Sequence, residues 1–270
     1  MRKKNVISVL LVLGVMTAYY YTEKKEQVIS KDVNTTENKT PNDSSKFNYL
    51  PSSTTGQIIH HNGYSLSYDE KHEQAEWVAY RLHSNDIAYS KFKRPYFIQD
   101  PKVKTQSSDW RNYKKSGYDK GHLCPAGDRK ATLKAFNETF YTSNITPQKH
   151  DFNAGIWNRL EQKVRYWAKR NKQVYVVTGG ILNSGNKTIG KEKVTVPNTF
   201  YKIVLDYTKP EIKAIAFLIP HKESKKPLYD FVTSIDIIEK KTGIDFFGHL
   251  PDNIENKLET SKDYKKWSFK

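Results

Sequence analysis

The chain has 270 residues, a mass of 31.4 kDa and a formal net charge of +16. Its aromatic content of 13% is too high for a disordered chain, and its mean hydropathy of −0.77 is too low for a polytopic membrane protein. The positive charge fits either a polyanionic partner, with nucleic acid first and anionic surfaces second, or a protein that is simply soluble and rich in lysine.

The first 21 residues have the pattern of an export signal. Three positive charges in residues 1–5 precede the apolar run Val6–Val15, and a basic segment before about ten apolar residues is typical of a secretory signal. The tyrosines at 19–21 could serve as an interfacial belt, so a retained membrane anchor through residues 6–21 is the alternative. The pattern predicts an exported protein, secreted, periplasmic or membrane-anchored with an extracytoplasmic domain, rather than one with a cytosolic N-terminal helix.

Residues 22–57 differ in composition from the rest of the chain. They are polar, rich in Lys, Glu, Asn, Ser and Thr, and show no sustained apolar periodicity. Such a segment cannot bury enough apolar surface to fold, so we expect a polar linker over residues 22–57. The globular domain is then expected to span residues 58–270.

Strands and helices are mixed along this domain. Alternating apolar and polar residues predict strands at 63–69 and 76–82, and residues 85–117 are predicted to be mostly loop. The apolar spacing in residues 153–171 predicts an amphipathic helix. The other predicted elements are a helix at 130–135, a buried strand at 174–178, strands at 199–206 and 212–219 joined by a turn at Lys209-Pro210, and a helix at 229–242 that ends at Gly243. Because strands and helices do not strictly alternate, the predicted class is α+β.

A dense polar stretch at residues 118–129, YDKGHLCPAGDR, contains a candidate base. His122 follows Gly121, which leaves space for the close approach of backbone or ligand. The ordinary pKa of histidine is about 6.5, so a neutral imidazole can accept a proton from water near physiological pH. The alternative is an ordinary hydrogen-bonded histidine. For a single histidine without further context, this alternative is favoured.

Asn153 and Glu161 lie eight residues apart in the predicted helix at 153–171. At about 100° per residue, both side chains can reach the same end and flank of this helix. One neutral and one anionic oxygen ligand suit a Mg²⁺ that keeps most of its water. The alternative is an N-cap at Asn153 and a solvated side chain at Glu161, and the spacing alone favours that alternative.

Several other chemistries are excluded or disfavoured. The single cysteine, Cys124, excludes an intramolecular disulfide and a thiolate zinc cage. Because Leu123 and Pro125 flank it, we predict a small packing residue rather than a nucleophile. His60 and His61 have no partners at a spacing typical of zinc sites. The sequence has no GxxxxGK[ST] phosphate loop, no HExxH and no GxSxG.

Five ordered blocks of sequence resemble one known family. They are YDKGHLCPAGD, FYTSNITPQKHDFNAGIWNRLE, VYVVTGGIL, VTVPNTFYKIVL and, near residues 238–247, IEKKTGIDFF. In the order and length of these blocks, the chain resembles the DNA/RNA non-specific endonucleases, which are ββα-metal (His-Me finger) nucleases. The resemblance implies an α+β ββα-metal fold with a central, mainly antiparallel sheet flanked by helices.

The resemblance also implies roles for individual residues. His122 corresponds to the general base of the family's D-R-G-H motif, and Asp119 to a supporting residue beside it. Asn153 corresponds to the one direct protein ligand of a hydrated Mg²⁺, for which Mn²⁺ could substitute. Glu161 corresponds to the carboxylate that holds the metal's waters.

Two basic residues complete the implied site. Arg94 is the nearest equivalent of the family's arginine that contacts the substrate phosphate. The arginine of the D-R-G-H motif is Lys120 in this chain, and lysine keeps the charge but loses the planar two-pronged grip on phosphate oxygens.

The leading hypothesis is therefore a Mg²⁺-dependent endonuclease that hydrolyses DNA, and with it RNA, without sequence specificity and leaves 5′-phosphate products. A homodimer is compatible with the resemblance. The alternative is a cell-surface nucleic-acid-binding protein with weak or no catalysis, suggested by Lys120 and by the predicted anchor. A third hypothesis, a secreted phosphodiesterase for small nucleotides, is disfavoured by the charge of +16.

Overall fold

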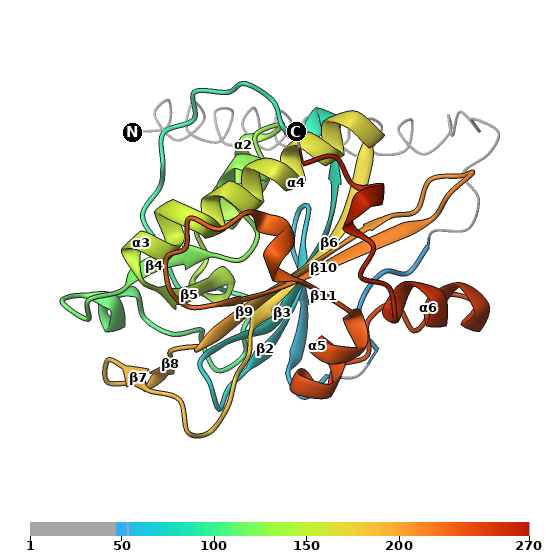
Figure 1. The fold of residues 1–270 in the computed structure, drawn as a ribbon. Coiled ribbons are helices and arrows are strands. Elements are labelled where there is room, and N and C mark those ends of the chain that lie inside the picture. Colours follow the sequence, from blue (N-terminus) through green and yellow to red (C-terminus); the bar gives the residue numbers. More distant parts are fainter. Residues whose placement is uncertain (1–46, 53, 270) are drawn as a thin grey trace, which may run out of the picture. The chain divides into compact units, whose positions relative to one another are not determined.

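A twisted antiparallel sheet forms the centre of the protein (Figure 1). The computed structural model describes residues 47–52 and 54–269. Within these residues the central sheet has seven strands in the order β1-β2-β3-β6-β9-β10-β11, and each neighbouring pair is antiparallel. The strands are β1 (Gln57–His60), β2 (Ser65–Asp69), β3 (Gln74–His83), β6 (Gln173–Gly180), β9 (Thr199–Asp206), β10 (Lys213–Pro220) and β11 (Val232–Thr233).

Different helices cover the two faces of this sheet (Figure 1). Successive side chains of a strand point to opposite faces. Accordingly, Val78 and Tyr80 of β3 belong to the core beneath α4 (Asn158–Asn171), whereas Trp77 and Ala79 belong to the core beneath α5 (Ile235–Thr242) and α6 (Asp252–Glu259). The helices and the antiparallel sheet form three layers, which confirms the predicted α+β class.

A small second sheet lies beside the N-terminal end of the long helix. β4 (Asp119–His122) pairs antiparallel with β5 (Ile145–Gln148), and α2 (Leu133–Glu138) lies between them in the chain. β5 leads through α3 (His150–Phe152) into α4, so two strands are followed by a helix. Two further short strands, β7 (Thr188–Ile189) and β8 (Val194–Thr195), form a separate hairpin.

The predicted helix at 153–171 is interrupted near its start. A π-helical segment, Asn153–Trp157, separates α3 from α4. Gly155 adopts a non-helical conformation there, and a Cβ at this position would overlap the Glu223 carboxylate. That carboxylate accepts a hydrogen bond of 3.1 Å from the Ile156 backbone N–H. A contact from a distant loop therefore replaces the regular helical pattern at the first turn.

Two other predicted helices differ from the structure. The predicted helix at 229–242 begins only at Ile235, because Val232 and Thr233 pair with β10 as β11 and follow a 3-10 turn at Leu228–Phe231. Its end is confirmed, since Gly243 caps it at a φ of 72° in the left-handed region. The helix predicted at 130–135 lies at Leu133–Glu138.

The compact part of the chain begins before the predicted boundary at residue 58. Phe47 stacks on Tyr207 with ring centroids 4.4 Å apart, and Thr55 donates a hydrogen bond of 3.0 Å to Glu76. The unit that includes these contacts spans residues 47–270. The predicted segment 1–21 and most of the predicted linker lie outside the described residues. No helix among the described residues is both long enough and apolar enough to span a bilayer.

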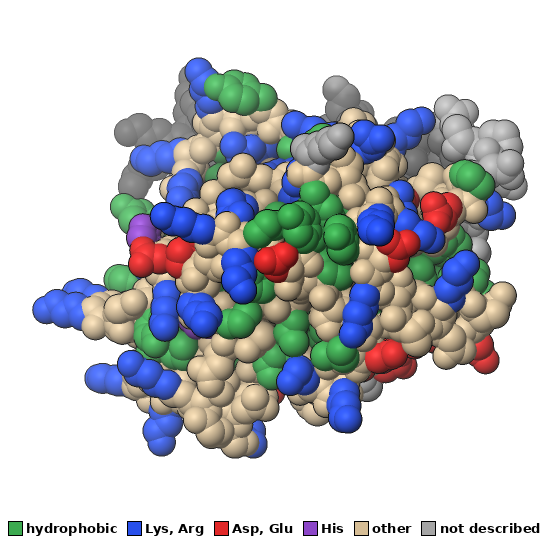
Figure 2. All heavy atoms as spheres, in the orientation of Figure 1, with side chains coloured by type: hydrophobic (Ala, Val, Ile, Leu, Met, Phe, Trp, Pro, Cys, Tyr) green, Lys and Arg blue, Asp and Glu red, His purple; other side chains and the backbone are tan. Residues whose placement is uncertain are grey.

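Lysine and arginine side chains are spread over the face drawn in Figure 2, and several gather where β7 and β8 lie in Figure 1. This distribution agrees with the net charge of +16. The positive charge is therefore a property of the folded surface and is not confined to the segments outside the described residues.

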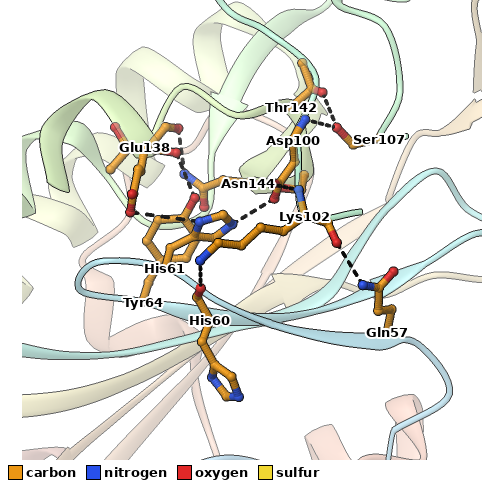
Figure 3. Close-up of polar contacts among 12 residues, drawn as sticks. Gln57, His60, His61, Tyr64, Asp100, Lys102, Ser107, Glu138, Thr142 and Asn144 are labelled. Carbon is orange, nitrogen blue, oxygen red and sulfur yellow. Dashed lines mark hydrogen bonds and ion pairs between the residues drawn. The ribbon is translucent and has the colours of Figure 1, made fainter. Parts of the chain in front are cut away.

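A buried polar network anchors the long loop at residues 85–117 (Figure 3). His61 Nε2 lies 2.8 Å from Asp100 Oδ2 in this loop, and its Nδ1 lies 3.9 Å from Glu138 at the end of α2. Tyr64 donates a hydrogen bond of 2.8 Å to the Glu138 carbonyl. The segment predicted to be a loop is thus fixed at Asp100 to β1, β2 and α2.

Candidate active site

A cavity of about 380 Å³ lies where β4 meets the first turns of the long helix and the segment before Pro95. Its lining includes residues that the sequence singled out from three separate segments. They are Arg94, Lys120, His122, Asn153 and Glu161. The fold therefore brings the candidate base and the candidate metal-binding residues to one space.

Asp119 supports this cavity from the side and is not part of its lining. Its carboxylate accepts hydrogen bonds from Asn153 Nδ2 at 3.0 Å and from His150 Nδ1 at 2.9 Å. The hydrogen-bonded partner of Asp119 is thus the candidate metal ligand rather than the candidate base. Because Asn153 uses its NH₂ group for Asp119, its amide oxygen remains available as an acceptor or a ligand.

His122 occupies a half-buried, partly aromatic position at the end of β4. Its ring centroid lies 5.0 Å from Phe140, edge to face, and 5.6 Å from Phe97. Nε2 is buried and has no hydrogen-bond partner within residues 47–52 and 54–269. Burial, and next the positive charge of Arg94, lower the pKa of His122 to about 3. The imidazole is therefore neutral at physiological pH and has a nitrogen without a partner.

Glu161 lies in the first turn of α4 and is half-buried where it lines the same cavity. Burial raises the pKa of this carboxyl to about 7, while Lys202 and Arg165 lower it and Asp128 raises it. Arg165 Nη1 lies 4.0 Å from Glu161 and donates a hydrogen bond of 2.8 Å to Asp128. Two carboxyl groups, Glu161 and Asp128, and two cations, Lys202 and Arg165, thus lie close together at this edge of the cavity.

Lys202 is a buried lysine in the middle of the central sheet. It faces α4 from β9, where its ammonium donates a hydrogen bond of 3.1 Å to Thr178 and lies 4.7 Å from the Trp157 ring centroid. Burial lowers the pKa of Lys202 to about 8, and the Glu161 carboxylate is the strongest influence in the opposite direction. Lys202 therefore supplies positive charge to Glu161 from beneath the helix.

The sequence-based interpretation missed Lys202 and Arg165. A signal existed for both: Lys202 shares a strand face with the apolar Phe200 and Val204, and Arg165 follows Glu161 at i+4 on the predicted helix. A lysine on the apolar face of a strand predicts a buried charge that needs a partner. An acidic residue four positions before an arginine predicts an ion pair on one helix face.

The oxygen donors of the cavity fit a hydrated divalent cation. The Asn153 amide oxygen and the Glu161 carboxylate are hard ligands, and they line the same space. Such a small set of protein ligands suits Mg²⁺, which keeps several of its waters. The residues present therefore fit the ion that the sequence resemblance implied.

The part of the cavity next to Phe97 and Phe140 is cationic. The Arg94 guanidinium carbon lies 5.4 Å from the Phe140 ring centroid, and Lys120 Nζ lies 5.3 Å from that of Phe97. Lys130 also lines the cavity. Aromatic faces hold two of these cations in place, so an anionic phosphate group is the ligand that this side would accept.

Cys124 is buried and unavailable for chemistry in the folded protein. Burial raises the pKa of its thiol to about 12, and its backbone N–H donates a hydrogen bond of 2.8 Å to Asn144. The predicted packing role of Cys124 is confirmed.

Comparison with known proteins decides the family. A sequence model of the DNA/RNA non-specific endonucleases matches residues 43–253. The chain belongs to this family. The membership confirms the family predicted from the ordered blocks and, with the geometry above, the ββα-metal fold, whose two strands and helix are β4, β5 and the α3–α4 helix.

Similar proteins include nucleases from distant organisms. The chain is 37% identical over 202 residues to the mitochondrial nuclease EXOG of Danio rerio, covering 68% of this chain and 59% of that protein. It is 32% identical to nuclease C1 of Cunninghamella echinulata var. echinulata, and the match covers 78% of this chain and 90% of that protein. A solved chain from the EndoG/EndoGI complex superposes with a TM-score of 0.71 at 29% identity, covering 78% and 92%. At 59% coverage, the chain spans less than two thirds of the length of EXOG of Danio rerio.

The predicted export is wrong. EXOG of Danio rerio, Mus musculus and Homo sapiens and endonuclease G of Homo sapiens are named as mitochondrial proteins. Three positive charges before a short apolar run are the only basis for export in the sequence, and this pattern is too general to specify a compartment. The expectations of a secreted, periplasmic or membrane-anchored protein are therefore withdrawn.

Proposed function

We propose that this chain is an active endonuclease that hydrolyses phosphodiester bonds in DNA and RNA without sequence specificity, depends on Mg²⁺ and leaves 5′-phosphate products. The observation that supports this proposal best is the single cavity lined by His122, Asn153 and Glu161 together with cationic side chains. This set combines a neutral base, oxygen donors for a divalent cation and positive charge for a phosphate.

His122 acts as the general base in this proposal. Its imidazole is neutral because burial and Arg94 lower its pKa to about 3, so it can accept a proton from the attacking water. A base with so low a pKa is weak, but a bound phosphodiester brings negative charge beside the ring and offsets Arg94. Both effects raise the pKa of His122 toward the operating pH when substrate is present.

Asn153 and Glu161 hold the cation. Asp119 accepts the hydrogen bond from the amide NH₂, which fixes the Asn153 oxygen toward the cavity. Lys202 and Arg165 supply positive charge to Glu161, which favours its ionised form as a partner for the metal's waters. When bound, the divalent cation supplies charge neutralisation at the phosphate and stabilises the leaving oxygen.

Mn²⁺ is the ion that could replace Mg²⁺ in this site. Arg94 and Lys120 bind the scissile phosphate. Contacts to phosphate oxygens position a nucleic acid but contain no sequence information, so a site of this kind need not discriminate between bases. Lysine at position 120 still neutralises the phosphate but provides no bidentate geometry. We therefore expect cleavage of any sequence, with phosphate binding dominated by charge.

The proposal is tested with purified protein on plasmid DNA and on RNA. We expect degradation of both with Mg²⁺, no activity in EDTA, recovery on adding Mg²⁺ back, and a loss of about 10²–10⁴-fold in His122→Ala. His249→Ala removes an exposed histidine outside the cavity and serves as the matched control. Equal activity of His122→Ala and wild type would refute the mechanism, and tight binding without turnover would favour the binding-protein alternative. Sedimentation of the same samples measures the predicted homodimer.

A further inference from the structure

A second basic cavity, of about 600 Å³, lies outside the catalytic one. It is formed by the turn at residues 109–116 and by the hairpin of β7 and β8. In Figure 2, Lys and Arg side chains gather where this hairpin lies in Figure 1. Its lining contains the cations Arg111, Lys114, Lys115, Lys187 and Lys191 and the acids Asp109 and Glu192, and it shares no residue with the catalytic cavity.

The two acids of this cavity are already used by the protein. Asp109 pairs with Arg111, with Nη1 and Oδ2 2.6 Å apart. Glu192 accepts hydrogen bonds from the Asp109 backbone N–H at 2.7 Å and from the Asn112 side chain. By contrast, the four cavity lysines are exposed, and none forms a salt bridge within the described part of the chain. Five cations and two acids therefore leave the lining of this cavity with a net charge of +3, and the charge of its lysines faces solvent.

The two segments that form the cavity are locked together. The Glu192 backbone N–H donates a hydrogen bond of 3.2 Å to Asn112 Oδ1. Gly190 has a φ of +69°, and a Cβ at this position would overlap Asn112, so glycine is required for the close approach of the hairpin. The lysines thus project from a defined framework rather than from two independent loops.

The same framework is joined to the catalytic hairpin. Tyr113 packs in one apolar cluster with Ile145 and donates a hydrogen bond of 3.3 Å to its carbonyl, and Ile145 is the cross-strand partner of His122. From the other segment, Lys187 Nζ lies 5.5 Å from the ring centroid of Tyr118, which immediately precedes β4. The position of the basic cavity relative to the catalytic base is therefore fixed by packing.

We propose that this basic cavity binds the phosphate backbone of the nucleic-acid substrate away from the bond that is cleaved. The inference rests on the proposed endonuclease function and extends it to the length of substrate that the protein holds. A chain of regularly spaced phosphates matches exposed lysines on a rigid support, since binding releases condensed counterions and requires no base contacts. Substrate would then occupy both cavities at once, and affinity would depend on polynucleotide length.

Binding is measured first, in EDTA, so that the result does not depend on catalysis. The test variant is Lys114→Gln with Lys187→Gln, which removes one charge from each segment. The control is Lys241→Gln with Lys257→Gln, which removes the same charge from α5 and α6, whose residues do not line the basic cavity. Fluorescence anisotropy with a labelled DNA duplex of about 30 base pairs is recorded over a range of salt concentrations.

The test variant is expected to bind about ten-fold more weakly, and the slope of log K against log salt to fall by about 1.8, or about 0.9 for each lost phosphate contact. The control variant should change the slope little. Equal losses of affinity and slope in the two variants would overturn the proposal, because net charge alone would then explain them.

Catalysis provides the second measurement. Hydrolysis of bis-nitrophenyl phosphate, which is too small to reach the basic cavity, should be unchanged in the test variant, while KM for long DNA rises several-fold. Loss of activity on the small ester would overturn the proposal, since it would place the lysines in the catalytic site. A wild-type protein that binds the duplex but cleaves neither substrate would refute the proposed function, and the salt slopes would still decide the role of the lysines.

Discussion

The π-helical segment at the start of the long helix gives the sharpest structural prediction. Gly155→Ala places a Cβ where the Glu223 carboxylate lies, so that carboxylate must move and its hydrogen bond to the Ile156 N–H is lost. With that bond gone, we expect the segment to relax toward a regular helix. Because each residue turns an α-helix by about 100°, removing the irregularity rotates Asn153 away from Glu161.

The expected magnitudes follow from these contacts. A hydrogen bond to a charged acceptor contributes about 1.5–3 kcal/mol, and the exposed position of Glu223 places this one near the lower end. For a domain of this size, about 1.5 kcal/mol lowers Tm by about 3–6 °C. The loss of activity should be larger, about 10²-fold, since a misplaced side chain at a reacting centre has that effect.

Thermal unfolding and plasmid cleavage are measured for Gly155→Ala, Glu223→Ala and the double variant. Glu223→Ala removes the hydrogen bond and the obstruction together, so it should reproduce most of the stability loss. The effects of the two single variants should then not add in the double variant, because both act on one contact. A Gly155→Ala protein with wild-type Tm and wild-type activity would refute the assignment of the π segment to Glu223 and its role in placing Asn153.

Three further predictions concern the catalytic cavity. Because the pKa of His122 is lowered to about 3 in the folded protein, the unfolded chain binds more protons below pH 6.5, and stability is lost as pH falls from 6.5 toward 3. Between pH 7.5 and pH 5, the free energy of unfolding measured by urea titration should therefore fall by about 2 kcal/mol more in wild type than in His122→Gln. Equal decreases would contradict a neutral imidazole held by burial. Asp119→Ala should raise the Mg²⁺ concentration needed for half-maximal activity by about 10–100-fold, whereas His150→Ala, which removes the other partner of the same carboxylate, should change it little. Lys202→Met should shift the acidic limb of the kcat–pH profile to higher pH by about one unit, because Lys202 lowers the pKa of Glu161. An unchanged limb would show that Lys202 does not influence this carboxylate.

Regular elements with strong apolar patterns could be predicted from the sequence. The strand predicted at 199–206 coincides with β9, and that predicted at 212–219 lies one residue from β10. The amphipathic spacing likewise predicted α4. In each case local side-chain periodicity is sufficient, because burial of one face or both faces determines the element. The residues of the catalytic cavity could be predicted for a different reason, because the ordered sequence blocks identified the family.

Features that depend on distant contacts could not be predicted in this way. The four residues of β4 are mostly polar, and the strand exists because it pairs with β5, which follows α2 in the chain. The π segment depends on Glu223, which lies on a separate loop. Likewise, His61 meets Asp100 and Glu138 only in the folded chain, so nothing in its local sequence indicates a buried network.

Full burial of Cys124 gives the folded protein an intrinsic probe of its own opening. The sequence has one sulfhydryl, and it lies in the apolar layer between the sheet and α4. An alkylating reagent can reach this sulfur only when that layer separates, and the thiolate forms readily only once the group is hydrated. The rate of mass increase in native buffer therefore counts these separations at a single position, without an introduced label.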